Sequence, residues 1–150
     1  MRILYIKSTS SLLLFLIQYT SLAFLLLSGP LFPEKWYAWI FYLPGWVLGL
    51  RSIFSMGMGN LNAAPDVLPA GRFVSSGPYR IIRHPMYAAI LLVFIPLVIT
   101  KPSLLRFICL CILILNLLIK IRYEERRLGE TFGQYAEYSD KTWRLIPYVF

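Results

Sequence analysis

The first group of side chains that could do chemistry is the run from Gly77 to Tyr87, which directly precedes an apolar segment. It contains the single histidine of the chain, His84, followed by Pro85. Proline suits the first turn of a helix, where its missing N–H costs nothing. We therefore expect His84 at a helix N-terminus, where free backbone N–H groups favour an anionic group. Tyr87, about one turn further on, would share its face.

A second group is the charged run that begins at Lys120, where the last apolar segment ends. Lys120 and Glu124 are four residues apart and would lie on one helix face, as would Arg122 and Arg126. Glu124 and Glu125 are adjacent carboxylates, which are costly at a membrane boundary unless they are paired. Their basic neighbours could pair them without any function, just as a lone histidine at such a boundary could be a simple interfacial residue.

The composition of the chain requires lipid as part of its solvent. The 150 residues are 58% hydrophobic, with a mean hydropathy of +0.64, which is more than a water-exposed globule can bury. The net charge of +8 is spread over the ends of apolar segments instead of forming one basic face, which argues against a nucleic-acid partner. Cys109 and Cys111 would point to opposite sides of a helix, and no metal site is expected.

Four apolar segments with few or no charges set the fold. They cover residues 12–28, 36–58, 85–100 and 104–121. A helix needs roughly 20 residues to cross a bilayer, and only the third segment is clearly short. The polar stretch 59–83 between the second and third segments predicts an interfacial loop. The sequence thus predicts an all-α integral membrane protein with about four transmembrane helices.

The last third of the chain is expected to form a helical hairpin and a tail. Residues 101–103 make a tight turn between the third and fourth segments. After residue 121 the chain is charged, and Leu128, Phe132 and Tyr135 follow at spacings of four and three. This pattern predicts an amphipathic tail helix that lies at the membrane surface.

The basic residues orient the four predicted spans. Four spans place both termini on one side, together with the 59–83 loop. Of the fifteen Lys and Arg residues, Lys35, Lys101 and Arg106 fall on the other side and Arg51 falls within a span, which leaves eleven. The positive-inside rule then places the termini and the loop in the cytoplasm. Because both reactive groups emerge on that face and the hairpin joins them, they can form one site.

Taken in order, these residues resemble a family signature. The signature residues are Gly77-Pro78-Tyr79, Arg83-His84-Pro85-Met86-Tyr87, Glu124-Glu125, Phe132-Gly133, Tyr135, Tyr138 and Ile146-Pro147. This set is similar to that of the isoprenylcysteine carboxyl methyltransferase and phospholipid methyltransferase superfamily, which are integral membrane enzymes that use S-adenosylmethionine. The resemblance covers roughly residues 58 to 150.

The resemblance implies roles for individual residues. It implies cofactor contacts for Tyr79, His84, Pro85, Met86, Tyr87, Glu124 and Glu125, and backbone contacts from Gly71, Arg72, Phe73 and Val74. It implies acceptor contacts for Lys120 and Arg122, and a catalytic role for His84, Lys120 and Glu124. Lys120 stands where the eukaryotic isoprenylcysteine enzymes have arginine, and a lysine cannot form the bidentate fork of arginine to a carboxylate. The resemblance thus implies either an isoprenylcysteine-like carboxylate or a lipid amine as the acceptor.

The implied protein is a multi-pass membrane enzyme that transfers a methyl group to a lipophilic small-molecule or lipid-modified acceptor, with S-adenosylhomocysteine as the product. Membrane lipids are its other partners. Its single structural domain would comprise the first two transmembrane helices over residues 1–58 and a catalytic region over residues 59–150. One alternative is an NADPH-dependent membrane reductase of the sterol or steroid class, but such chains typically have Asn where Pro85 stands. The other is a non-catalytic membrane adaptor, which leaves the joint spacing of the two groups unexplained.

Overall fold

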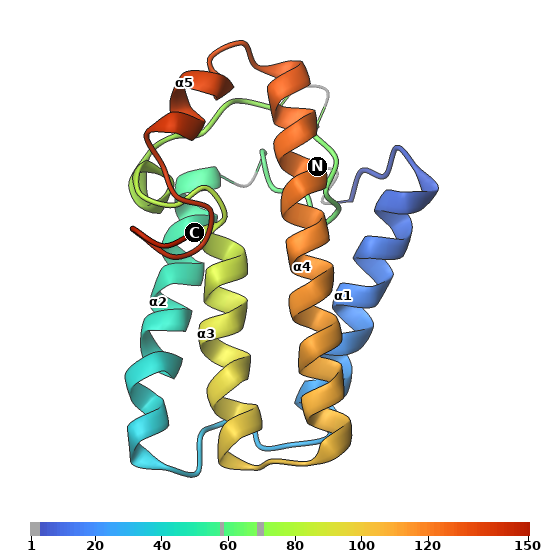
Figure 1. Ribbon diagram of the computed structural model, residues 1–150, viewed down its shortest axis with the longest axis vertical. Helices are drawn as coiled ribbons and strands as arrows, with labels where there is room; N and C mark the ends of the chain where they lie inside the picture. Colours follow the sequence, from blue (N-terminus) through green and yellow to red (C-terminus); the bar gives the residue numbers. More distant parts are fainter. Residues whose placement is uncertain (1–3, 58, 69–70) are drawn as a thin grey trace.

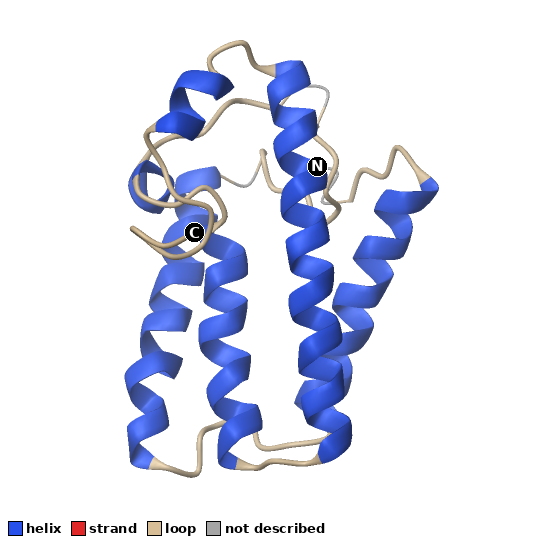
Figure 2. Ribbon diagram, viewed as in Figure 1, coloured by secondary structure: helices blue, strands red, loops and turns tan. Residues whose placement is uncertain are grey.

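The computed structural model describes residues 4–57, 59–68 and 71–150, and its architecture is helical (Figures 1 and 2). The helices are α1 (Thr9–Leu27), η1 (Trp36–Ala38), α2 (Trp39–Met56), η2 (Gly77–Arg80), α3 (Pro85–Thr100), α4 (Leu104–Thr131) and α5 (Tyr135–Asp140). Within these ranges there is no strand, only an isolated bridge between Ile82 and Trp143. The all-α prediction is confirmed, while Met58, the predicted end of the second segment, lies outside the described residues.

Local side-chain chemistry sets the ends of the helices. The Ser8 side chain accepts a hydrogen bond from the Ser11 amide at the start of α1, and Ser103 caps α4 in the same way. His84 is the N-cap of α3 and Pro85 is its first residue, as the sequence predicts. α2 ends at Gly57, whose φ of +75° lies in the region that favours glycine.

The four long helices pack as two close pairs. α2 runs along α3 and α1 runs along α4, and α3 and α4 join the pairs at the middle of the bundle (Figure 1). Gly45 makes the first pairing possible, because a Cβ atom there would lie 2.9 Å from both Leu92 Cβ and Val93 Cγ2. Small residues commonly allow such close approach between helices in membranes.

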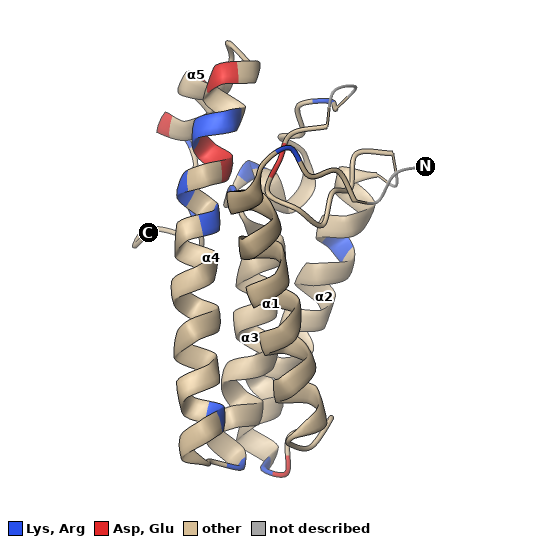
Figure 3. Cartoon of the chain, turned by 90° about the vertical axis from the view of Figure 1, so that its right-hand side faces the viewer, with Lys and Arg blue, Asp and Glu red and all other residues tan. Residues whose placement is uncertain are grey.

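Large apolar side chains cover the outside of the bundle. Phe54 of α2 is 81% exposed and Leu104 of α4 is 75% exposed, and α1 carries a similar row. α3 is the buried centre, and Ile99 is its one large apolar residue with strong exposure. Monomeric soluble proteins rarely expose apolar surface of this extent. Figure 3 adds that charged residues gather at the two ends of the bundle, mostly at the end with both termini.

In the part of the chain that the structure describes, two helices, α1 and α4, are long and apolar enough to cross a membrane, which is fewer than the four predicted. α3 is apolar but has only 16 residues. α2 has 18 residues, but Pro44 and the charged Arg51 lower its hydropathy, and it is not one of these two helices. Membrane crossing by α2 and α3 is therefore not established by length and composition.

The predicted tail helix differs in extent from the observed one. The charged residues after 121 continue α4 to Thr131, because most residues from 122 to 128 are strong helix formers such as Arg, Glu and Leu. The chain leaves the helix at Phe132, and α5 is a separate helix of 6 residues. Leu128, Phe132 and Tyr135 thus do not form a stripe on one surface helix. They line a pocket instead.

Candidate functional site

A pocket of about 380 Å³ lies where α3 begins and α4 leaves the apolar part of the bundle. All four long helices and the loop between α2 and α3 contribute to its walls. The predicted site residues that line it are Gly71, Arg72, Phe73, Val74, Tyr79, His84, Pro85, Met86, Tyr87, Lys120 and Glu124. The two reactive groups of the sequence, which the α3–α4 hairpin separates, therefore meet in one pocket.

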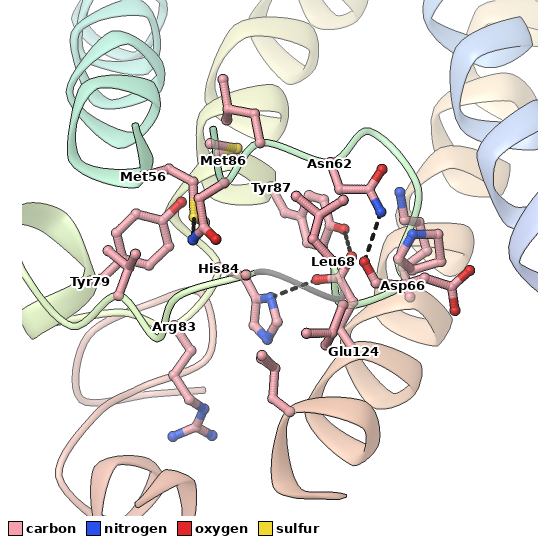
Figure 4. Close-up of a pocket in the computed structure, with 18 of the residues that line it drawn as sticks. Met56, Asn62, Asp66, Leu68, Tyr79, Arg83, His84, Met86, Tyr87 and Glu124 are labelled. Carbon is pink, nitrogen blue, oxygen red and sulfur yellow. Dashed lines mark hydrogen bonds and ion pairs between the residues drawn. The ribbon is translucent and has the colours of Figure 1, made fainter. Parts of the chain in front are cut away.

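His84, Tyr87 and Glu124 converge at the centre of this pocket (Figure 4). One helical turn places the rings of His84 and Tyr87 parallel, with centroids 5.6 Å apart and an interplanar angle of 1°. The Tyr87 hydroxyl donates a hydrogen bond to Glu124 Oε1, and His84 Nδ1 lies 3.4 Å from Glu124 Oε2. Both carboxylate oxygens of Glu124 are thus held by residues from the start of α3.

The two carboxylates of α4 also control the charge of His84. Burial alone would lower the pKa of His84, but hydrogen bonds and charge interactions with Glu124 and Glu125 outweigh burial and raise this pKa above its ordinary value. The imidazole is therefore biased toward its protonated form. In that form both ring nitrogens carry a proton, so the ring donates hydrogen bonds and cannot accept a proton.

Glu125, the neighbour of Glu124, does not line the pocket, and its Oε1 lies 3.5 Å behind the ring of His84, at Nε2. Its carboxylate pairs with Arg83 Nε at 2.8 Å and with Arg144 Nε at 2.9 Å. Burial alone would raise the pKa of Glu125, but hydrogen bonds from His84, Arg83 and Arg144 lower it to about 2. Arg83 also donates to the backbone carbonyl of Thr142, so this cluster fastens the C-terminal tail to the start of α3.

Glu125 and Arg122 are the predicted site residues that do not line the pocket. Arg122 is exposed on α4, and the Glu125 side chain is only 12% exposed within its own ion pairs. Their roles as cofactor and acceptor contacts stay predictions. Arg51, the charge within the second predicted span, is exposed on α2 and also lies outside the pocket lining.

The segment from Gly71 to Val74 is braced by a residue that sequence reasoning missed. The Asn60 side chain accepts a hydrogen bond from the Arg72 amide at 2.7 Å and donates to the Arg72 carbonyl at 2.8 Å. Phe73 packs against the rings of Phe132, Tyr135 and Tyr138, with centroids 5.1 to 6.3 Å away. An asparagine in a loop often bonds to nearby backbone, which is the one signal that pointed to Asn60.

The same loop is tied to the N-terminal segment. Asp66 is 5% exposed, and its carboxylate accepts from the Lys7 amide at 2.7 Å and from the Tyr123 hydroxyl at 2.9 Å. Asn62 accepts from the Tyr5 amide and donates to the Tyr5 carbonyl, both at 3.0 Å. These contacts hold residues 60–66, which line the pocket, between the N-terminal segment and α4.

Lys120 is almost fully buried, with 1% of its side chain area exposed. Its ammonium donates to Gln18 Oε1 at 2.6 Å and to the Ala63 carbonyl at 3.4 Å, and it lies 5.3 Å from the centre of the Tyr87 ring. Gln18 comes from α1 and also lines the pocket. Its signal in the sequence was a polar amide inside an otherwise charge-free apolar segment, a placement that often marks function in membranes.

The pocket combines a polar end with an apolar remainder. Carboxylate, imidazole and ammonium groups lie close together, while Ile53, Met56 and Ile90 line other parts of the wall. A ligand that fits must therefore carry both charged and apolar groups.

Comparison with known proteins bears on this region of the chain. Residues 33–135 match the family model of phospholipid methyltransferases. The matched stretch includes α2, α3, α4 and every predicted site residue, while α1 and most of the C-terminal tail lie outside it. No curated protein matches the chain.

Proposed function

Because the chain belongs to the phospholipid methyltransferase family, we propose that it is a membrane enzyme that transfers a methyl group from S-adenosylmethionine to a lipophilic acceptor. The observation that carries this proposal is the convergence of both reactive groups in one pocket with charged and apolar walls. The family supports methyl transfer over the alternatives of a reductase and of a non-catalytic adaptor.

The residues of the pocket fit such a cofactor. Its volume of about 380 Å³ lies within the usual range of roughly 300 to 1,000 Å³ for sites that enclose a small molecule. His84 lies between the two carboxylates of α4, with Nδ1 3.4 Å from Glu124 Oε2 and Nε2 3.5 Å from Glu125 Oε1, so it orients Glu124 from the pocket wall. Glu124 would hold a cationic part of the cofactor, and the backbone of Gly71 to Val74 would hold neutral polar parts.

The cofactor supplies a methyl group that is already activated, so the chain must bind, orient and exclude water. Tyr87 and His84 hold the Glu124 carboxylate in a fixed direction. Residues from 60–68 and 71–74 line the pocket and are braced by Asn60 and Asp66. Since the raised pKa of His84 favours imidazolium, an amine acceptor would arrive neutral or lose its proton to another group.

The proposed arrangement in the membrane has four spans, with the pocket and both termini on the cytoplasmic side. The long apolar α1 and α4 and the exposed apolar surface of α2 support spans around the buried α3. The excess of basic residues at the pocket end of the bundle supports its cytoplasmic side. The short α3 would cross because its neighbours, and not lipid, surround most of it.

The test is a thermal unfolding measurement on the purified protein with added ligands. S-Adenosylhomocysteine should stabilise the protein by RT ln(1 + [L]/Kd), or about 2.7 kcal/mol at 100 times Kd. NADPH at the same concentration is the control and should have no effect. Stabilisation by NADPH, without any by millimolar S-adenosylhomocysteine, would overturn the proposal in favour of a reductase.

A further inference from the structure

Lys120 is a buried cation that lacks an acidic partner. None of the ion pairs among the described residues includes it. Glu124, one turn further along α4, is engaged by Tyr87 and His84 instead. A buried charge is stable only when it is compensated, and the ammonium lies on the wall of a pocket. An anionic group of a ligand in the pocket would supply that compensation.

Gln18 determines where this ammonium lies. Its amide oxygen accepts from Lys120 Nζ at 2.6 Å across the interface between α1 and α4, and only 4% of the Gln18 side chain is exposed. A lysine ammonium has three donors, and Gln18 and the Ala63 carbonyl occupy two of them. A glutamine satisfies the donor without neutralising the positive charge, whereas a glutamate would neutralise it.

We propose that Gln18 of α1 is a positioning residue: it holds the Lys120 ammonium, the acceptor contact that the family resemblance implies, without neutralising it, and so sets a preference for acceptors with a carboxylate or phosphate group. This inference rests on the proposed function in taking the ligand to be the methyl acceptor. It brings α1, which lies outside the family match, into the site.

A purely structural role for Gln18 makes a different prediction, and Asn116 provides the matched control. Asn116 is 3% exposed and donates to the Leu14 carbonyl at 3.1 Å, so it joins the same two helices one turn earlier on α4. Unlike Gln18, Asn116 does not line the pocket. If Gln18 only packs α1 against α4, substitutions at the two positions should change stability but not ligand preference.

The experiment compares three lipids with the same oleoyl chain on the full-length protein in detergent. Oleate carries a carboxylate, lysophosphatidic acid carries a phosphate, and monoolein is neutral. Binding is measured for the wild type and for Gln18→Met, Gln18→Glu, Lys120→Met and Asn116→Leu. Titration with S-adenosylhomocysteine is run separately on each variant and tests the cofactor part of the proposed function.

We expect the wild type and Asn116→Leu to bind at least one anionic lipid roughly tenfold more tightly than monoolein, because monoolein cannot form the charge-assisted bond to Lys120. The lipid that shows the preference identifies carboxylate or phosphate as the source. Gln18→Met and Lys120→Met should lose the preference. Gln18→Glu keeps a hydrogen-bond acceptor for Lys120 but cancels its charge, so it should lose the preference while staying folded.

An equal preference in the wild type and in Lys120→Met would overturn the anion site. A preference that survives in Gln18→Glu would overturn the role of Gln18, even if Gln18→Met fails to fold. If the variants at Gln18 and Lys120 lose the preference but the wild type does not bind S-adenosylhomocysteine, the anion site is supported and the proposed methyl transfer is contradicted. The two proposals therefore fail separately.

Discussion

Glu124 and Glu125 are neighbours in the sequence, but the structure predicts different consequences for ligand binding when each is replaced by glutamine. Glu124 lines the pocket, whereas Glu125 is held by Arg83 and Arg144 outside it. Glu124→Gln should therefore weaken the binding of S-adenosylhomocysteine, and it should also lower stability because Tyr87 and His84 lose a charged partner. Glu125→Gln should destabilise the fold and leave that affinity nearly unchanged.

The size of each effect follows from the contacts that are lost. Glu125→Gln removes the charge from two bonds of 2.8 and 2.9 Å and replaces one acceptor by a donor. Hydrogen bonds to charged groups contribute about 1.5 to 3 kcal/mol each, and the pair with Arg144 counts for less because that side chain is 40% exposed. The expected loss of stability is about 2 to 4 kcal/mol, or roughly 4 to 16 °C in Tm by the scaling of soluble domains. For Glu124→Gln, a single buried contact to a ligand corresponds to roughly five- to 150-fold in affinity.

The assay combines thermal unfolding of both variants with calorimetric titration of S-adenosylhomocysteine, and each variant serves as the control for the other. If Glu125→Gln lowers the affinity as strongly as Glu124→Gln while Tm stays the same, Glu125 contacts the cofactor as the family resemblance implies. The division of roles inferred from the structure would then be wrong.

Three further outcomes follow from the structure. Because its pKa is raised in the folded state, protonated His84 stabilises the fold, and this contribution should be complete below about pH 6.5 and be lost as the pH rises through the folded pKa. Thermal unfolding from pH 5.5 to 9 would show this pH dependence, and His84→Asn should abolish it. Gly45→Ala should lower the free energy of unfolding by about 1 to 3 kcal/mol, because the new Cβ forces α2 and α3 apart. Gly49→Ala is the control and should be tolerated, since its Cβ would lie 3.5 Å from Ala89 Cβ, and chemical unfolding compares the two variants. Cysteine labelling in intact membranes should place both termini and the 59–83 loop in the cytoplasm, and a loop on the opposite side from the tail would contradict a shared site.

The sequence predicts the helices well where local chemistry sets them. The starts of α3 and α4 follow from Pro85 and Ser103, whose effects act within one turn. The predicted end of the fourth helix at residue 121 was wrong, because the end of an apolar segment marks where contact with lipid ends and not where the helix ends. The charged residues beyond 121 have high helix propensity and continue the same helix into water.

The site was predictable to the extent that it follows from motifs. His84, Tyr87, Lys120 and Glu124 were expected together, and they line one pocket. Gln18 was not predicted, because its contact with Lys120 joins residues 102 positions apart and depends on how α1 packs. The sequence marks Gln18 only as a polar amide in an apolar segment, and its partner is a property of the tertiary arrangement.

The position of the pocket along α4 explains how one site could serve two kinds of ligand. Lys120 and Glu124 lie one helical turn apart, where the apolar part of α4 gives way to its charged part. Glu124 is held by Tyr87 and His84 at the start of α3, while Lys120, one turn nearer the apolar part of α4, reaches Gln18 of α1 and the Ala63 carbonyl. A water-soluble cofactor would therefore bind on the Glu124 side and a lipophilic acceptor on the Lys120 side. One turn of α4 separates the two contacts, and Tyr87 connects them. Its hydroxyl donates to Glu124, and its ring lies beneath the Lys120 ammonium.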